Sequence, residues 1–140
     1  MVDAQLRIAN RLAEIDKAGE WAERFCSSHG LPAEARTGLR ISLDEALSNI
    51  ISYAYDDGRE HEIALRLTYA EGTLALMVED DGVPFDPTQA PVAERGGSVM
   101  EREVGGLGIE FLKNLNDQVA YERVDGRNRL VLKKNVTETT

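Results

Sequence analysis

The chain has 140 residues, 42% of them hydrophobic, and a formal net charge of −9 at pH 7. This length and composition suit one globular domain, and the acidity argues against direct binding to the phosphate backbone of nucleic acids. The single cysteine, Cys26, excludes an intramolecular disulfide, and no apolar run approaches the ~20 residues of a membrane span. Because the N-terminus also lacks the features of a signal peptide, we expect a cytoplasmic protein that does not enter a membrane.

The first half of the chain is predicted to contain one short strand and two helices. Residues Leu6 to Ala9 suit a strand, and apolar positions at helical spacing predict a helix from Asn10 to Ser28. Gly30 and Pro32 separate it from a longer helix, which is predicted over Ala33 to Tyr55 because apolar residues again recur on one side.

Two pairs of strands are predicted farther along, each joined by a turn that contains glycine. The first pair is Ile63 to Tyr69 and Thr73 to Val78, and the second is Gln118 to Arg123 and Arg129 to Lys133. We therefore expect at least two hairpins in the sheet.

Between the two pairs the sequence is irregular. Gly and Pro are frequent from Asp80 to Gly108, and so long a stretch without periodicity inside a compact domain is usually functional or mobile. A short helix is predicted from Ile109 to Asn116, and the final residues, Asn135 to Thr140, are typical of a frayed tail.

Glu45 and Asn49 are the first candidate site residues. Their spacing puts both side chains on one face of the second helix, beside its apolar stripe. A carboxylate there can act as a general base, and a neighbouring amide oxygen can help to hold Mg²⁺, which prefers oxygen ligands. A solvated helix face has the same spacing, and the pair taken alone favours that simpler interpretation.

The stretch VEDDGVPFDP, Val78 to Pro87, puts three consecutive acids at the end of a predicted strand. The carboxylate of Asp80 can accept a hydrogen bond from an exocyclic amine such as that of adenine. Gly82 would let a flat base approach the backbone closely, and Pro84 would stiffen the turn. An acidic surface turn is the alternative, because Asp-Asp-Gly is ordinary turn chemistry.

The segment GGLGIEFLKNL, Gly105 to Leu115, runs from glycines directly into a predicted helix. The free N–H groups at a helix start suit an anion such as phosphate. The segment is not a Walker A loop, because the Gly-Lys-Ser/Thr ending is missing, and it lacks the third glycine of the dinucleotide-binding motif. A flexible linker before a helix is the alternative.

In their order and spacing, these three segments resemble the GHKL ATPases, which share the Bergerat nucleotide-binding fold. EALSN, Glu45 to Asn49, resembles the N box of that superfamily, DDGVPFD its first glycine box and GGLGI its second. The length, the Pro-Phe-Asp ending and the final strand pair are similar to the bacterial anti-sigma-factor serine/threonine kinases, over about Leu6 to Lys134. The resemblance implies an α/β fold: a two-layer sandwich with a mixed sheet and helices on one face.

The resemblance also implies roles for individual residues. Glu45 is expected to be the general base and Asn49 the Mg²⁺ ligand. Asp80 is expected to bind the adenine amine, with Gly82 and Pro84 forming the turn beside the base.

The phosphates of ATP are expected to meet the second glycine box. Its residues are Gly105, Gly106, Leu107 and Gly108. An ATP lid is expected over about residues 88–104, inside a single domain that covers residues 1–140.

The implied function is that of an ATP- and Mg²⁺-dependent kinase that binds a sigma factor and phosphorylates a small anti-anti-sigma protein of the STAS type. Ser52 and Tyr53 stand where relatives often carry a basic residue and a histidine, which favours one alternative, a nucleotide-dependent binding switch without transfer. A histidine kinase catalytic domain is the second alternative. Neither His29 nor His61 resembles a phosphoacceptor, which argues against it.

A homodimer is also expected from the resemblance. Leu6 and Ile8 are apolar at alternate positions around Arg7, which suits an edge strand, and an edge strand is a natural pairing site. The alternative is a strand that packs only against its own sheet.

Overall fold

In the computed structural model, residues 1–86 and 112–136 are described. Over these residues the elements follow in the order β1 (Val2–Ala9), α1 (Glu14–Ser28), α2 (Ala33–Tyr53), β2 (Glu62–Ala70), β3 (Thr73–Asp80), β4 (Gln118–Val124) and β5 (Arg127–Asn135). Residues 112–115 form one further helical turn before β4. None of the helices in this part of the chain is long and apolar enough to cross a membrane.

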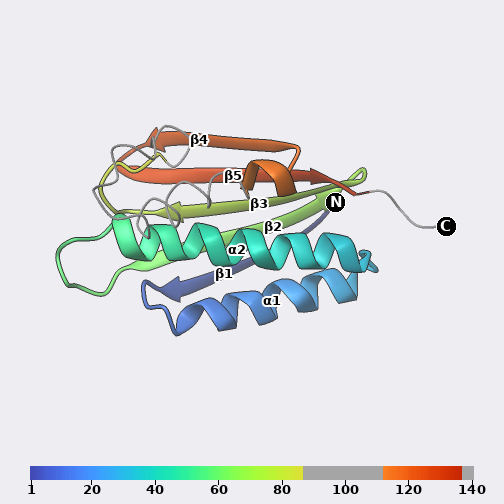
Figure 1. The fold of residues 1–140 in the computed structure, drawn as a ribbon, viewed down its shortest axis with the longest axis horizontal. Coiled ribbons are helices and arrows are strands. Elements are labelled where there is room, and N and C mark those ends of the chain that lie inside the picture. Colours follow the sequence, from blue (N-terminus) through green and yellow to red (C-terminus); the bar gives the residue numbers. More distant parts are fainter. Residues whose placement is uncertain (87–111, 137–140) are drawn as a thin grey trace.

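The strands form one sheet in the order β1-β2-β3-β5-β4, and both long helices cover the same face of it (Figure 1). The two-layer α/β sandwich predicted from the sequence is therefore confirmed. The prediction of a mixed sheet is wrong, because each described pair of neighbouring strands is antiparallel. Two hairpins, β2-β3 and β4-β5, fix most of these directions, and β5 then lies antiparallel to β3.

Tight two-residue turns close both hairpins. Glu71 and Gly72 have φ of 51° and 78°, and Asp125 and Gly126 have φ of 52° and 78°. Positive φ at both central positions is the geometry whose twist matches that of the flanking strands. The predicted turns are thus confirmed at the residues where the sequence places glycine.

The core lies between the helices and the inward faces of the central strands. Leu65, Val78 and Leu130 are in register across β2, β3 and β5, and all three are buried. A second row, one step along the same strands, consists of Leu67, Leu76 and Leu132. Helix α2 covers these rows with its own buried apolar residues, which are Leu39, Leu43, Ala46, Leu47 and Ile50.

Helix α1 packs against α2 at a glycine. A Cβ placed on Gly19 would lie 2.2 Å from Nε of Arg40, so this side chain crosses α1 only because Gly19 has none. Arg40 then reaches the carboxylates of Glu23 and Asp16 on α1, at 3.3 and 3.6 Å. The apolar contact between the helices is thus bordered by an ionic one.

Several predicted boundaries differ from the observed ones by a few residues. Helix α1 begins at Glu14, not at Asn10, and Oε1 of Glu14 accepts a hydrogen bond from the N–H of Ala9 at 3.1 Å. Strand β1 begins at Val2, because pairing with β2 continues that far. Asn135, predicted to lie in the frayed tail, is the last residue of β5 and pairs with Thr73. Residues 137–140 lie outside the described part.

We expect that replacing Gly38 with Ala stabilises the fold. Gly38 lies inside α2, and a Cβ there would have no atom within 4 Å. The change removes the helix penalty of glycine, so the free energy of unfolding should rise by about 0.5–1 kcal/mol in urea denaturation.

Gly19→Ala is the matched control for this prediction, because it gains the same helix propensity inside α1. Its Cβ would overlap the Arg40 side chain, which must then leave its position across α1. Equal gains in stability for the two variants would contradict the packing described above.

Candidate functional site

Asp80 ends β3 at a position that faces the helices. Its side chain is 2% exposed, and in the sheet it pairs with Asn128 of β5. Oδ1 of Asp80 accepts hydrogen bonds from Nδ2 of Asn128 and from the N–H of Gly82, both at 2.9 Å. The pKa of Asp80 is raised above its usual value, because the effect of burial exceeds that of these two hydrogen bonds, which lower it. No donor among the described residues reaches Oδ2, so this oxygen can accept a bond from a ligand.

Asn128 organises the residues that follow β3. In addition to its hydrogen bond with Asp80, Nδ2 of Asn128 donates to the carbonyl of Val83 at 2.8 Å. Its Oδ1 accepts hydrogen bonds from the N–H of Phe85, from the hydroxyl of Tyr121 and from Nη1 of Arg123. One buried amide therefore ties the turn after β3 to the β4-β5 hairpin.

Asn128 was missed by the sequence analysis, which began the last strand at Arg129. A signal for it was present. Leu130 and Leu132 face the core, and the same alternation continued backward puts Asn128 on that face. A polar residue at a core-facing strand position requires partners, which marks it as a candidate site residue.

Gly82 is required where β3 meets the end of α2. A Cβ there would lie 2.3 Å from the carbonyl oxygen of Ala54, so any larger residue would push the turn away from the helix. The N–H of Val83 donates to the same oxygen at 2.8 Å. The sequence predicts that Gly82 lets a flat base approach, and the contact with Ala54 is a second reason for glycine at this position.

Asn49 lies on α2 and faces the same small cavity as Asp80. The cavity has a volume of about 10 Å³, and its lining is Ala46, Asn49, Ile50, Asp80, Phe85, Leu112, Tyr121, Asn128 and Leu130. Asn49 is 5% exposed, and its side chain lines the cavity that Asp80 also lines. A buried amide at a cavity can bind a ligand or a metal that enters it.

Glu45 lies one helical turn before Asn49 and is half-buried. It does not line the cavity that contains Asn49 and Asp80. Burial raises the pKa of Glu45, and the neighbouring charge of Asp44 raises it further. A carboxylate whose pKa moves toward neutrality is a better base than an ordinary one.

The remaining predicted residues lie at the edge of the site or outside the described part. Pro84 is exposed in the turn after β3, and Tyr53, at the end of α2, stacks on Phe85 with ring centroids 5.8 Å apart. The second glycine box, residues 105–108, and the expected lid, residues 88–104, fall outside the described residues.

Residues 8–134 match the family model for a histidine kinase-like ATPase domain. The chain belongs to this family. It is 32% identical over 112 residues to the serine/threonine-protein kinase BtrW of Bordetella bronchiseptica, covering 80% of this chain and 79% of the relative. It is 29% identical over 93 residues to the serine-protein kinase RsbW of Bacillus subtilis, covering 63% of this chain and 58% of that relative. The resemblance drawn from the three sequence segments is therefore confirmed, and both of these relatives are protein kinases.

Solved structures support the same fold. The RsbU and RsbW domains of a Mycobacterium tuberculosis protein match 99% of this chain and 34% of their own, with a TM-score of 0.71 at 11% identity. The SiaB–SiaC complex of Pseudomonas aeruginosa contains a chain that matches 92% of this one and 88% of its own, with a TM-score of 0.57 at 15% identity.

We expect that Asn128→Ala lowers the free energy of unfolding by about 2–3 kcal/mol, because it removes several buried hydrogen bonds and leaves polar groups unpaired. Guanidinium denaturation measures the loss. Asn135→Ala is the control, since Asn135 is exposed at the other end of β5 and should change stability by less than about 0.5 kcal/mol. Similar losses for both variants would show that Asn128 contributes no more than an ordinary strand residue.

Proposed function

We propose that the protein is an ATP- and Mg²⁺-dependent serine/threonine kinase that binds a sigma factor and phosphorylates a small anti-anti-sigma protein. One observation carries the proposal. In a chain of the histidine kinase-like ATPase family, a buried carboxylate with one open oxygen, Asp80, lines the same cavity as a buried amide, Asn49. This shared cavity supports the proposal that Asp80 binds the base and Asn49 the metal.

The proposed adenine contact uses Oδ2 of Asp80. Two donors hold Oδ1, which fixes the plane of the carboxylate and directs Oδ2 away from them. An adenine amine donates to such an oxygen, whereas the carbonyl of guanine would be repelled by it. Phe85 and Leu130 line the same cavity and supply apolar surface for the base.

The proposed Mg²⁺ contact is the amide oxygen of Asn49. Mg²⁺ is commonly held by one or two protein oxygens together with water and substrate phosphates, so a single buried amide that lines the cavity fits it. When bound, the ion neutralises charge on the phosphates. We propose that the backbone of residues 105–108 contacts those phosphates as well, as free N–H groups at a helix start do.

Glu45 is the proposed general base. Its carboxylate would take the proton of the substrate serine or threonine hydroxyl as that oxygen bonds to the γ-phosphorus. The bond from the γ-phosphorus to the β–γ bridging oxygen breaks, and ADP leaves with the electron pair. The position of Glu45 one turn from Asn49 puts the base on the same helix face as the proposed metal ligand.

The proposed assembly is a homodimer that pairs through the edge of the sheet. Strand β1 pairs with β2, and no described strand lies on its other side. Leu6 packs toward the core, while Asp3, Gln5 and Arg7 are exposed along the strand. A second chain would therefore meet backbone hydrogen-bonding groups and polar side chains at this edge.

A binding switch without phosphoryl transfer is the second candidate. The observation that favours it is Tyr53. This residue stands at a position where relatives often carry a histidine, and its ring packs on Phe85. Incubation with labelled ATP and a STAS-type protein separates the two candidates, because only the kinase labels its partner.

Asp80→Asn should weaken ATP binding at least about tenfold in calorimetry, because the charge-assisted bond to the adenine amine is lost. Asp125→Asn removes the same charge from the exposed β4-β5 turn and should leave the affinity unchanged. If Asp80→Asn leaves the ATP affinity unchanged, Asp80 is only a turn acid and the proposed contact with adenine is wrong.

Glu45→Gln should lower phosphoryl transfer by a factor of about 10² or more while ATP binds within a few-fold of the parent, since the amide keeps the size but cannot accept the proton. Single-turnover labelling of the STAS-type protein measures transfer, and calorimetry measures binding. Glu34→Gln, in the first turn of α2, is the control. If binding and transfer fall together, the role of Glu45 is structural and the proposed base is wrong.

A further inference from the structure

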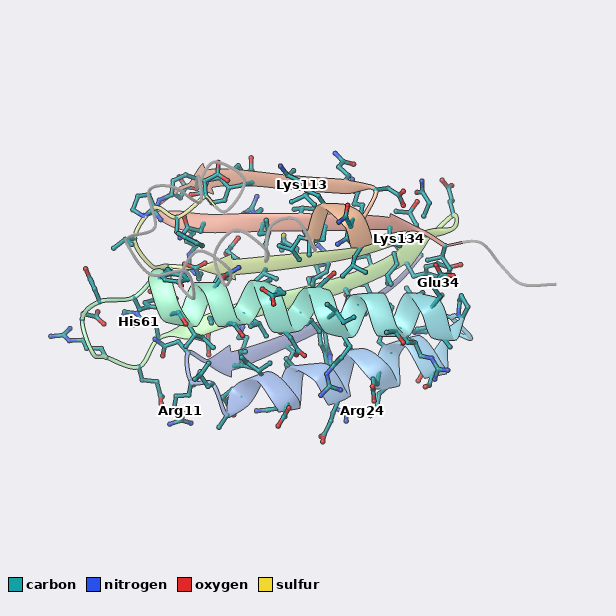
Figure 2. The ribbon with its side chains drawn as sticks, viewed as in Figure 1. Arg11, Arg24, Glu34, His61, Lys113 and Lys134 are labelled. Atoms are coloured by element: carbon teal, nitrogen blue, oxygen red, sulfur yellow. The ribbon has the colours of Figure 1, made fainter. Side chains whose placement is uncertain are left out.

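His61 lies between α2 and β2, in a cluster that the proposed chemistry does not use. Figure 2 shows it beside the end of α2, and there its Nε2 lies 2.7 Å from Oδ2 of Asp57. Its Nδ1 lies 3.3 Å from Oδ1 of Asp81. The imidazole stacks on Tyr55 with centroids 4.5 Å apart, and the Tyr55 hydroxyl donates to Asp81 at 3.0 Å.

This geometry suits the protonated form of His61. A neutral imidazole has one N–H and one bare nitrogen, so it can donate to one carboxylate while its other nitrogen faces the second. Both ring nitrogens of His61 face carboxylate oxygens, and only an imidazolium can donate to both. In that form, Asp57 and Asp81 share a single cation.

The cluster joins two segments that meet at the proposed nucleotide site. Asp57 and Tyr55 belong to the loop after α2, whereas Asp81 directly follows Asp80. The backbone of His61 is fixed independently, since its N–H donates to Oδ1 of Asn10 at 2.7 Å and its carbonyl accepts from the N–H of Asn10 at 3.0 Å. A change of protonation at His61 therefore affects the contacts of the side chains in the cluster and leaves its backbone in place.

We propose that His61 is a positioning residue for nucleotide binding, whose imidazolium holds Asp81 and thereby the Asp80–Gly82 turn in its binding conformation. The inference rests on the proposed function, because it assumes that Asp80 binds adenine. Loss of the cation leaves Asp57 and Asp81 facing an uncharged ring, with Asp80 next in the chain. The turn then loses the charged part of its contact with His61, while the hydroxyl of Tyr55 still donates to Asp81.

The surrounding charges determine the direction of the pH dependence. The hydrogen bond to Asp57 raises the pKa of His61, partial burial lowers it, and the hydrogen bond to Asp81 raises it again, for a net increase. The other groups nearby are Arg59, whose N–H donates to Asp57, and the Tyr55 hydroxyl. Because the folded-state pKa of His61 is raised, the contribution of the imidazolium to nucleotide binding is complete below about pH 6.5. It disappears as the pH rises through that raised pKa.

His61→Gln tests the inference through the ratio of two affinities. The dissociation constant of ADP is measured for the parent and the variant from pH 5.5 to 9, and the ratio cancels the titration of the ADP phosphates. At the acidic end, the parent should bind ADP at least about fivefold more tightly than His61→Gln does. A fivefold effect lies at the low end of typical coupling between sites. The two proteins should bind equally at the alkaline end.

A second measurement needs no change at His61. The chain has two histidines, so proton NMR resolves two imidazole titrations, assigned with a His29→Gln variant. By linkage, a fivefold coupling raises the pKa of His61 by about 0.7 unit when ADP is bound, while His29 serves as the internal reference. Asp57→Asn should reduce this increase, and Asp56→Asn, which removes the same charge from the adjacent residue, should leave it intact.

The outcomes separate the inference from the function on which it rests. Parallel affinity profiles for the parent and His61→Gln, or equal effects of Asp57→Asn and Asp56→Asn, would overturn the role of His61 alone. A parent protein that binds no adenine nucleotide at any pH would overturn the proposed function and this inference together.

Discussion

The hydrogen bond between Asn128 and Asp80 is the contact on which the candidate site depends. A carboxylate at a core-facing strand position is costly to desolvate unless it is hydrogen-bonded, and here the neighbouring strand supplies the donor. The same amide then binds Val83 and Phe85, so the turn after β3 takes its shape from β5. The site is therefore assembled only when the β4-β5 hairpin has joined the sheet beside β3.

Helix α2 is the second part of the frame, because both halves of the site contact it. Asn49 extends from its buried face, and the carbonyl of Ala54 at its end receives the N–H of Val83. Gly82 permits this contact, since a side chain would collide with Ala54. The leucine rows that bury α2 against the sheet thus also fix the distance between the proposed metal ligand and the proposed base-reading acid.

Most of the fold could be predicted from the sequence, because helical spacing and glycine turns are local signals. They placed α2 to within two residues at its end and found both hairpins. The pairings of β1 with β2 and of β3 with β5 were not predictable in this way, since they join residues far apart in the chain. Asp80 and Asn49 were candidates from local sequence features, and the resemblance to the GHKL ATPases supplied their expected roles. The alternation of β5 marks Asn128 as core-facing, but its partner Asp80 lies 48 residues away in the sequence and could not be predicted locally.

The three consecutive acids at the end of β3 acquire distinct roles from the alternation of the strand. Glu79 points to the uncovered face of the sheet and pairs with Arg129 at 3.0 Å. Asp81 turns toward the imidazole of His61 and accepts a hydrogen bond from the hydroxyl of Tyr55. Asp80 faces the helices, and of the three it alone has no ion pair within the described residues. Its partner Asn128 is neutral, so it orients the carboxylate without forming an ion pair with it. Of the three acids, Asp80 is therefore the one that can bind an incoming ligand.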